Sequence, residues 1–206
     1  SAASDVYKRQ GYGTMASESA DQLRQMGINR PTHVFVQAGV GSLAGAVIGY
    51  YANLFPNDPP KFIVMEAQAA DCLYRGALAG DGAPRMVDGD LTTIMAGLAC
   101  GEPNTISWDI LRNHVSAFIS CPDWVSAKGM RMLSSPVKGD PRVVSGESGA
   151  VGMGVLDAIM CDDTYKELRD ALELDRHSRV LMFSTEGNTD PMKFRKVLWD
   201  GEYPTV

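Results

Sequence analysis

The most constraining feature of the chain is a succession of segments between residues 32 and 66. An apolar run at 32–38 (THVFVQA) is followed by a glycine turn at 39–42 (GVGS), an apolar helical segment at 43–54 and a second apolar run at 61–66. Both runs are apolar almost throughout instead of alternating, which is typical of strands buried on both faces of a parallel sheet. The succession therefore predicts a strand–helix–strand unit with helices on both faces of the sheet.

The rest of the chain continues this alternation. We expect further strands at 117–120 and 179–184, the latter a buried one, and a short helix or loop at 91–100. We expect helices over 11–26, 108–113, from Pro122 to about 133, over 145–158 and 162–174, and from Pro191 onward. The fold class predicted is α/β, with a mostly parallel sheet and helices on both faces.

Composition excludes some classes of function. The formal net charge is −6 and the pI is about 5.0, which argues against a nucleic-acid-binding surface. No apolar run approaches the roughly 20 residues that cross a bilayer, so we expect no membrane partner. The four cysteines show neither C-x-x-C spacing nor a histidine partner. We therefore expect no metal site, and reduced thiols in a cytoplasmic protein.

The first ten residues are interpreted as non-native. A transposase adapter used in sequencing libraries translates in frame to Asp-Val-Tyr-Lys-Arg-Gln, which is the sequence of residues 5–10. We expect residues 1–10 to be such a translation. We expect residues 11–206 to be the C-terminal part of a catalytic domain whose N-terminal half lies upstream.

The glycine turn at 39–42 suits a phosphate group, because it leads from a strand into a helix whose first N–H groups are unpaired. One alternative is a tight turn with no ligand. A second is a dinucleotide site, because Gly39, Gly41 and Ala44 fit the pattern G-x-G-x-x-A, and Glu66 lies at a workable distance to hold a ribose. The third is a cradle for pyridoxal phosphate (PLP).

Six motifs favour the third alternative, because together they closely resemble the diaminopropionate ammonia-lyase family. They are residues 10–14 (QGYGT), 37–45 (QAGVGSLAG), 70–75 (ADCLYR), 93–104 (TIMAGLACGEPN), 145–152 (SGESGAVG) and 184–190 (STEGNTD). This family belongs to the PLP enzymes of the tryptophan synthase β and threonine dehydratase type, also called fold type II. The resemblance runs from about Gly11 to the C-terminus.

The resemblance implies that the complete enzyme is a lyase that converts 2,3-diaminopropionate to pyruvate and ammonia, and that it is a homodimer. It implies a phosphate site at Gly39, Val40, Gly41, Ser42 and Leu43. Ser42 could add a hydroxyl donor or cap the following helix. Alternatives are a threonine or serine dehydratase-like PLP lyase and, with only the glycine turn in its favour, an NAD-binding dehydrogenase.

Thr185 matches the position at which relatives place a hydroxyl against the pyridine nitrogen of the cofactor. Its alternative role is to cap the turn after the last strand. Glu66 is expected at the ligand-facing rim or, alternatively, as a solvated carboxylate at the strand end. Glu147 could face the cleft or cap a helix. Cys72 and Cys100 are the pair most able to form a disulfide.

No catalytic residue is expected within this chain. Relatives place the lysine that forms a Schiff base with the cofactor well upstream, together with the acids that transfer protons. The lysines from Lys61 onward lie in no suitable motif, and His33, His114 and His177 are expected to be structural. We therefore expect this chain alone to be inactive.

Overall fold

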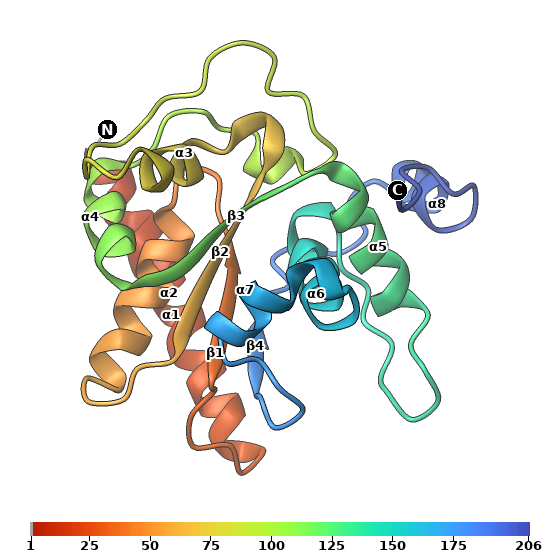
Figure 1. The fold of residues 1–206 in the computed structure, drawn as a ribbon, viewed down its shortest axis with the longest axis horizontal. Coiled ribbons are helices and arrows are strands. Elements are labelled where there is room, and N and C mark those ends of the chain that lie inside the picture. Colours follow the sequence, from red (N-terminus) through yellow and green to blue (C-terminus); the bar gives the residue numbers. More distant parts are fainter. Residues whose placement is uncertain (1) are drawn as a thin grey trace.

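The computed structural model describes the backbone of residues 2–206 and the side chains of residues 11–206. It forms a four-stranded sheet in the order β3-β2-β1-β4, in which every neighbouring pair is parallel (Figure 1). The strands are β1 (His33–Gln37), β2 (Lys61–Ala67), β3 (Val115–Cys121) and β4 (Val180–Met182). The parallel sheet predicted from the apolar runs is confirmed.

The helices divide between the two faces of this sheet. Helices α1 to α4 gather on one side of the strands and α5 to α7 on the other (Figure 1). Their bounds are α1 (Ala2–Gln25), α2 (Ser42–Leu54), α3 (Cys72–Ala79), α4 (Thr105–His114), α5 (Asp123–Ser134), α6 (Glu147–Cys161), α7 (Lys166–Ala171) and α8 (Pro191–Leu198). Three short 3₁₀ turns complete the chain: η1 (Gln68–Ala70), η2 (Ala96–Leu98) and η3 (Asp163–Tyr165).

Two separate apolar cores follow from the alternation of side chains along β1. Val34 and Val36 point into the core formed with α1, α2, α3 and α4. Phe35, between them, points into the core formed with α5, α6 and α8. Because successive side chains of a strand face opposite sides, a strand covered on both sides is apolar at successive positions along its middle. This explains the uninterrupted apolar runs.

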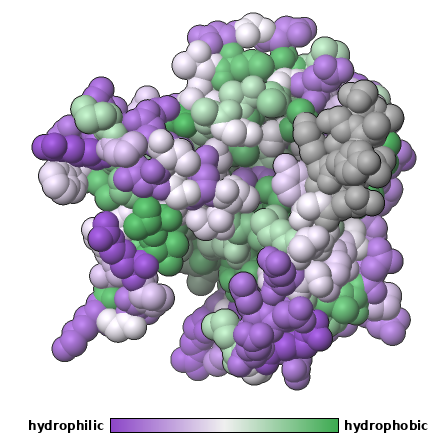
Figure 2. Space-filling model, turned by 180° about the vertical axis from the view of Figure 1, so that it is seen from behind, coloured by the Kyte–Doolittle hydropathy of each residue, from purple (hydrophilic) through white to green (hydrophobic). Residues whose placement is uncertain are grey.

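The remaining surface is mixed. Seen from behind, polar residues project along the edges of the molecule, and apolar residues gather between them (Figure 2). No helix among the described residues is long and apolar enough to cross a membrane.

Three expectations about elements need correction. The last strand is shorter than the predicted 179–184 and is half-buried instead of buried, because β4 lies at an edge of the described sheet. The single helix predicted over 162–174 is instead the 3₁₀ turn η3 followed by the short helix α7. Helix α3, in addition, is not predicted by the sequence patterns at all. The interpretation of residues 1–10 as an adapter translation stays a prediction. The side chains of these residues lie outside the described part of the structure.

Helices α5 and α6 approach each other so closely that glycine is required at their contact. A Cβ atom on Gly129 would lie 2.0 Å from the carbonyl oxygen of Ala150, and one on Gly154 would lie 1.9 Å from that of Val125. Both neighbours are backbone atoms, which cannot move aside as a side chain can. The two helices therefore pack through small residues at backbone distance.

We predict that Gly129→Ala or Gly154→Ala lowers the free energy of unfolding by about 3 kcal/mol, because the added methyl group overpacks this contact. Gly49→Ala is the matched control, since Gly49 lies inside α2 and its nearest neighbour would be Ile110 Cδ1 at 3.9 Å. This control should gain about 0.5–1 kcal/mol from helix propensity. Urea unfolding measures both effects, and equal stability of the three variants would contradict the packing argument.

Candidate functional site

A cavity of about 300 Å³ opens at the carboxyl end of β1. Its wall includes the glycine turn from Gly39 to Leu43, Gln37 from the end of β1, and Thr185, which follows β4. Because β1 and β4 run parallel, the segments after them meet at the same edge of the sheet. Ligands of open parallel sheets bind at this edge. The structure thus brings together all six residues that the sequence predicted to bind a cofactor.

The turn into α2 depends on Gly41. Its φ of +94° lies in the left-handed region, and an added Cβ would approach Leu111 Cδ1 to 3.0 Å. The first amide of α2 that reaches a backbone carbonyl is that of Gly45, which donates to Gly41 O at 2.8 Å. The preceding N–H groups start the helix and carry its positive dipole end, and the first turn holds no acidic residue. This end of α2 suits an anion.

Ser42 is the first residue of α2, and the N-cap is Gly41, which makes no side-chain capping bond. The alternative role of Ser42 as an N-cap is therefore wrong. Ser42 is buried and lines the cavity together with the glycine turn.

Thr185 belongs to the part of the cavity wall that follows β4, and its hydroxyl is held by Gln37. The Gln37 amide nitrogen donates to Thr185 Oγ1 at 3.0 Å and to the carbonyl oxygen of Phe183 at 2.8 Å. Thr185 therefore does not act as a simple turn cap. Gln37 belongs to one of the six motifs, but sequence reasoning assigned it no role.

The N-terminus of α6 forms another part of the wall. Its Ser148 amide donates to Glu186 Oε1 at 2.7 Å, and Gly146 N donates to Glu186 O at 2.9 Å. The buried hydroxyl of Ser148 lines the cavity and has no hydrogen-bond partner among the described residues. Sequence reasoning missed both Ser148 and Glu186 as wall residues. The cluster of glycines around 146–152 was the available signal.

Glu147 is the first residue of α6, buried, with one carboxylate oxygen unpaired among the described residues. Its side chain is absent from the cavity wall. His33 is structural as expected, because it is buried and its Nε2 lies 2.8 Å from Leu172 O. Among residues 11–206, no lysine lines the cavity.

The loop containing η2 covers the glycine turn. A Cβ on Gly39 would lie 3.4 Å from the carbonyl oxygen of Gly97 and 3.6 Å from Cys100 Cβ. Cys72 Sγ lies 3.8 Å from Cys100 O, so the segments that carry the two cysteines lie close together. Both thiols are nevertheless free in the structure, and burial raises the pKa of the Cys72 thiol to about 12.

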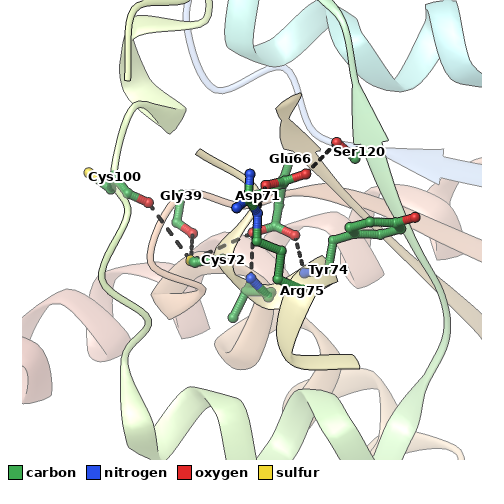
Figure 3. A network of polar contacts seen from close by, with 9 residues as sticks. Gly39, Glu66, Asp71, Cys72, Tyr74, Arg75, Cys100 and Ser120 are labelled. Carbon is green, nitrogen blue, oxygen red and sulfur yellow. Dashed lines mark hydrogen bonds and ion pairs between the residues drawn. The ribbon is translucent and has the colours of Figure 1, made fainter. Parts of the chain in front are cut away.

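Glu66 overturns the expectation of a ligand-facing or solvated carboxylate. It is fully buried, and its two oxygens accept hydrogen bonds from Leu73 N at 2.8 Å and Tyr74 N at 2.7 Å (Figure 3). Glu66 thus caps α3, whose own N-cap residue, Asp71, makes no such bond. Asp71 instead pairs with Arg75 and accepts from Ser120 Oγ (Figure 3).

This position of Glu66 counts against a dinucleotide site, since that alternative needs its carboxylate for a ribose. Both carboxylate oxygens are already engaged inside the protein. The missed helix α3 has the same explanation, because its cap comes from another element and not from its own sequence.

Burial also changes the acidity of Glu66. Removing its charge from water is more unfavourable than the hydrogen bonds from the amides of Leu73 and Tyr74 are favourable. Burial therefore raises the pKa of Glu66 from an ordinary 4.5 to about 8.

Comparisons with known proteins agree with the site. Residues 1–186 match the family described as pyridoxal-phosphate dependent enzyme. The chain is 49% identical over 194 residues to diaminopropionate ammonia-lyase of Escherichia coli (strain K12), covering 94% of this chain and 48% of that protein. The chain thus spans about half the length of the curated relatives it matches.

Solved structures show the same relationship. The crystal structure of the Escherichia coli diaminopropionate ammonia-lyase with an aminoacrylate-PLP azomethine reaction intermediate superposes with a TM-score of 0.85 at 47% identity, covering 95% of this chain and 49% of that one. The processed form of threonine deaminase isoform 2 from Solanum lycopersicum superposes with a TM-score of 0.72 at 19% identity, covering 96% of this chain and 50% of that one. The second likeness shows the fold alone.

Glu66 generates a pH prediction. Its raised pKa means that the folded state binds more protons than the unfolded state between pH 4.5 and about 8. The free energy of unfolding should therefore fall as the pH rises through this interval and then level off, by about 2–4 kcal/mol relative to Glu66→Gln, which cannot titrate. Denaturant unfolding of both proteins from about pH 5 to 9 measures the difference, and parallel pH profiles would refute it.

Proposed function

The chain belongs to the pyridoxal-phosphate dependent enzymes, and from this premise we propose that it forms the cofactor-binding part of a diaminopropionate ammonia-lyase. The complete enzyme would eliminate the β-amino group of 2,3-diaminopropionate and release pyruvate and ammonia. The observation that carries the proposal is the cavity itself, whose wall joins the glycine turn 39–43 to Thr185.

The cavity fits the cofactor at both ends. The unpaired amides that begin α2 and the Ser42 hydroxyl suit its phosphate, and the absence of acidic residues from the first turn of α2 agrees with this. The unpaired, buried hydroxyl of Ser148 is a polar atom that a ligand would satisfy. A volume of about 300 Å³ lies in the range of cavities that hold small cofactors.

Each residue of the wall has a separate task. When bound, PLP supplies an electron sink for the charge that develops as the α-proton of an amino acid leaves. The amides of Gly41, Ser42 and Leu43 would bind the phosphate and so fix the position of the ring. The Thr185 hydroxyl would donate a hydrogen bond to the ring nitrogen. Because a hydroxyl is neutral, it leaves that nitrogen largely unprotonated, which favours elimination over transamination.

The substrate assignment rests on likeness at the level of sequence. The chain is 49% identical to a curated diaminopropionate ammonia-lyase but 19% identical to the threonine deaminase that shares its fold. A threonine or serine dehydratase-like lyase is therefore the second candidate. The homodimer implied by the resemblance and the cytoplasmic location inferred from the cysteines stay predictions.

The cavity wall also bears on which part of the reaction this chain performs. It binds and orients the cofactor, but among residues 11–206 it offers no lysine for a Schiff base. We propose that this lysine and the acids that transfer protons come from an upstream half of the enzyme.

We predict that Gly41→Ala weakens PLP binding by about tenfold or more, because a side chain at φ +94° distorts the turn that presents the amides. Gly27→Ala is the matched control. Gly27 also has a positive φ of +75°, has no neighbour within 4 Å of an added Cβ, and is absent from the cavity wall. Fluorescence titration with PLP measures both variants, and equal affinities would refute the phosphate site.

We further predict that the chain of 206 residues releases no pyruvate from 2,3-diaminopropionate, whereas the full-length native protein does. Pyruvate is measured with a coupled lactate dehydrogenase assay, and threonine and serine are tested as alternative substrates. Preference of the full-length protein for threonine would favour the second candidate. Pyruvate release by the chain alone would refute an upstream lysine.

A further inference from the structure

Gln37 occupies an unusual position for a polar side chain. It is the last residue of β1, only 2% of its surface is exposed, and it lies between the glycine turn and the end of β4. Burying a side-chain amide at the end of a strand is unfavourable for folding unless its polar atoms are paired. Its amide nitrogen is paired twice, with Phe183 O at 2.8 Å and with Thr185 Oγ1 at 3.0 Å.

The first of these contacts fixes the orientation of the amide. A backbone carbonyl oxygen can only accept, so the Gln37 atom that faces Phe183 O must be the NH₂ group. The opposite orientation would place two oxygens against each other and would leave a buried acceptor without a donor. The same nitrogen faces Thr185, so the second contact is fixed as well.

The orientation of the amide determines the direction of the Thr185 hydroxyl. Since Gln37 donates, Thr185 Oγ1 accepts, and its own proton points away from Gln37. Among the described residues, Thr185 Oγ1 makes no hydrogen bond in which it is the donor. The neighbouring Ser184 hydroxyl donates to Ser145 Oγ at 2.9 Å, and Glu186 Oε1 accepts from Ser148 N, so neither group makes a hydrogen bond with Thr185. Thr185 therefore presents a hydrogen-bond donor to the cavity.

We propose that Gln37 is a positioning residue that holds Thr185 as a donor, so that this end of the cavity selects an aromatic nitrogen in its unprotonated, accepting form. The proposal rests on the proposed function, which places the ring nitrogen of PLP at Thr185. The new element is the role of Gln37. This residue lies on β1, and the carbonyl oxygen of Phe183 fixes the orientation of its amide. Without Gln37, the Thr185 hydroxyl could rotate and serve equally as donor or acceptor.

The test compares PLP with its 1-deaza analogue, in which a C–H group replaces the ring nitrogen and the phosphate is unchanged. The ratio of their dissociation constants reports the Thr185 hydrogen bond and needs no catalysis. For the full-length native protein we expect PLP to bind about tenfold more tightly than the analogue, the value of one good hydrogen bond.

Gln37→Glu is the decisive variant because it keeps the shape and reverses the hydrogen bond. The oxygen that replaces Nε2 carries at most one proton, and this proton is donated to Phe183 O. In either protonation state Thr185 must then donate to the introduced carboxyl oxygen and present a lone pair to the cavity. We expect the ratio to fall from about tenfold to about one or below. Thr185→Val should also give a ratio of about one, and adding Gln37→Glu to it should change the ratio no further.

Gln37→Met serves if the Gln37→Glu protein is too unstable to purify. It frees the hydroxyl to rotate, and we expect a ratio of about threefold. Asn53→Ala is the control, because the Asn53 amide also donates to a backbone carbonyl, that of Gly49 at 2.7 Å, but is exposed on α2 outside the cavity wall. It should keep the tenfold ratio.

The outcomes separate this inference from the proposed function. If Gln37→Glu or Gln37→Met weakens PLP and the analogue equally, the ratio is unchanged, the role of Gln37 is merely structural and the inference is wrong. If the unmodified protein binds neither compound, the proposed function itself fails.

Discussion

The parallel pairing of β1 with β4 is the constraint on which the rest of the site depends. His33, Val34 and Phe35 pair with Val180, Leu181 and Met182, so both strands end at the same edge of the sheet. The glycine turn follows one strand and Thr185 follows the other, although they are far apart in the sequence. The Gln37 amide joins the two segments beyond the last backbone pair, through Phe183 and Thr185. A single backbone register therefore sets the distance between the two ends of the cavity.

Three helices begin at or near this edge, and the treatment of their first amides differs. Helix α3 is capped by Glu66 from the preceding strand, and α6 is capped by Glu186 from the segment after β4. Both caps are carboxyl groups, whose oxygens accept hydrogen bonds from the unpaired N–H groups. Among the described residues, the first turn of α2 has no such partner, since no side chain caps it. An anion from outside the chain can therefore bind at α2, while the other two helix ends are satisfied internally.

Unfavourable groups occur in this chain where close packing requires them. A buried carboxylate at Glu66 and glycines at helix contacts are individually unfavourable, since the first loses its hydration and the second lose backbone entropy on folding. Each occurs where an element must lie close to another: Glu66 holds α3 against the end of β2, and Gly129 and Gly154 let α5 and α6 approach to backbone distance.

The sequence by itself determined the class of fold, the order of most elements and the position of the glycine turn between β1 and α2. These properties depend on local patterns, namely uninterrupted apolar runs such as residues 61–66, proline and glycine positions, and motifs a few residues long. The resemblance carried by six motifs extended this to the cofactor and predicted a role for Thr185, which lies in the same cavity wall as the glycine turn. Element boundaries near the sheet edge, as in β4, were less predictable because burial there depends on neighbouring strands.

Only the tertiary structure decided the roles of single polar side chains. Glu66 was expected to face a ligand, but it is buried as the cap of α3. Ser42 was a possible cap, and Gly41 takes that place instead. Gln37 had no expected role, and its contact with Phe183 makes it the residue that orients Thr185. The physical reason is common to these cases: a carboxylate, hydroxyl or amide can pair with several partners, and which partner lies within about 3 Å is set by the packing of elements distant in the sequence.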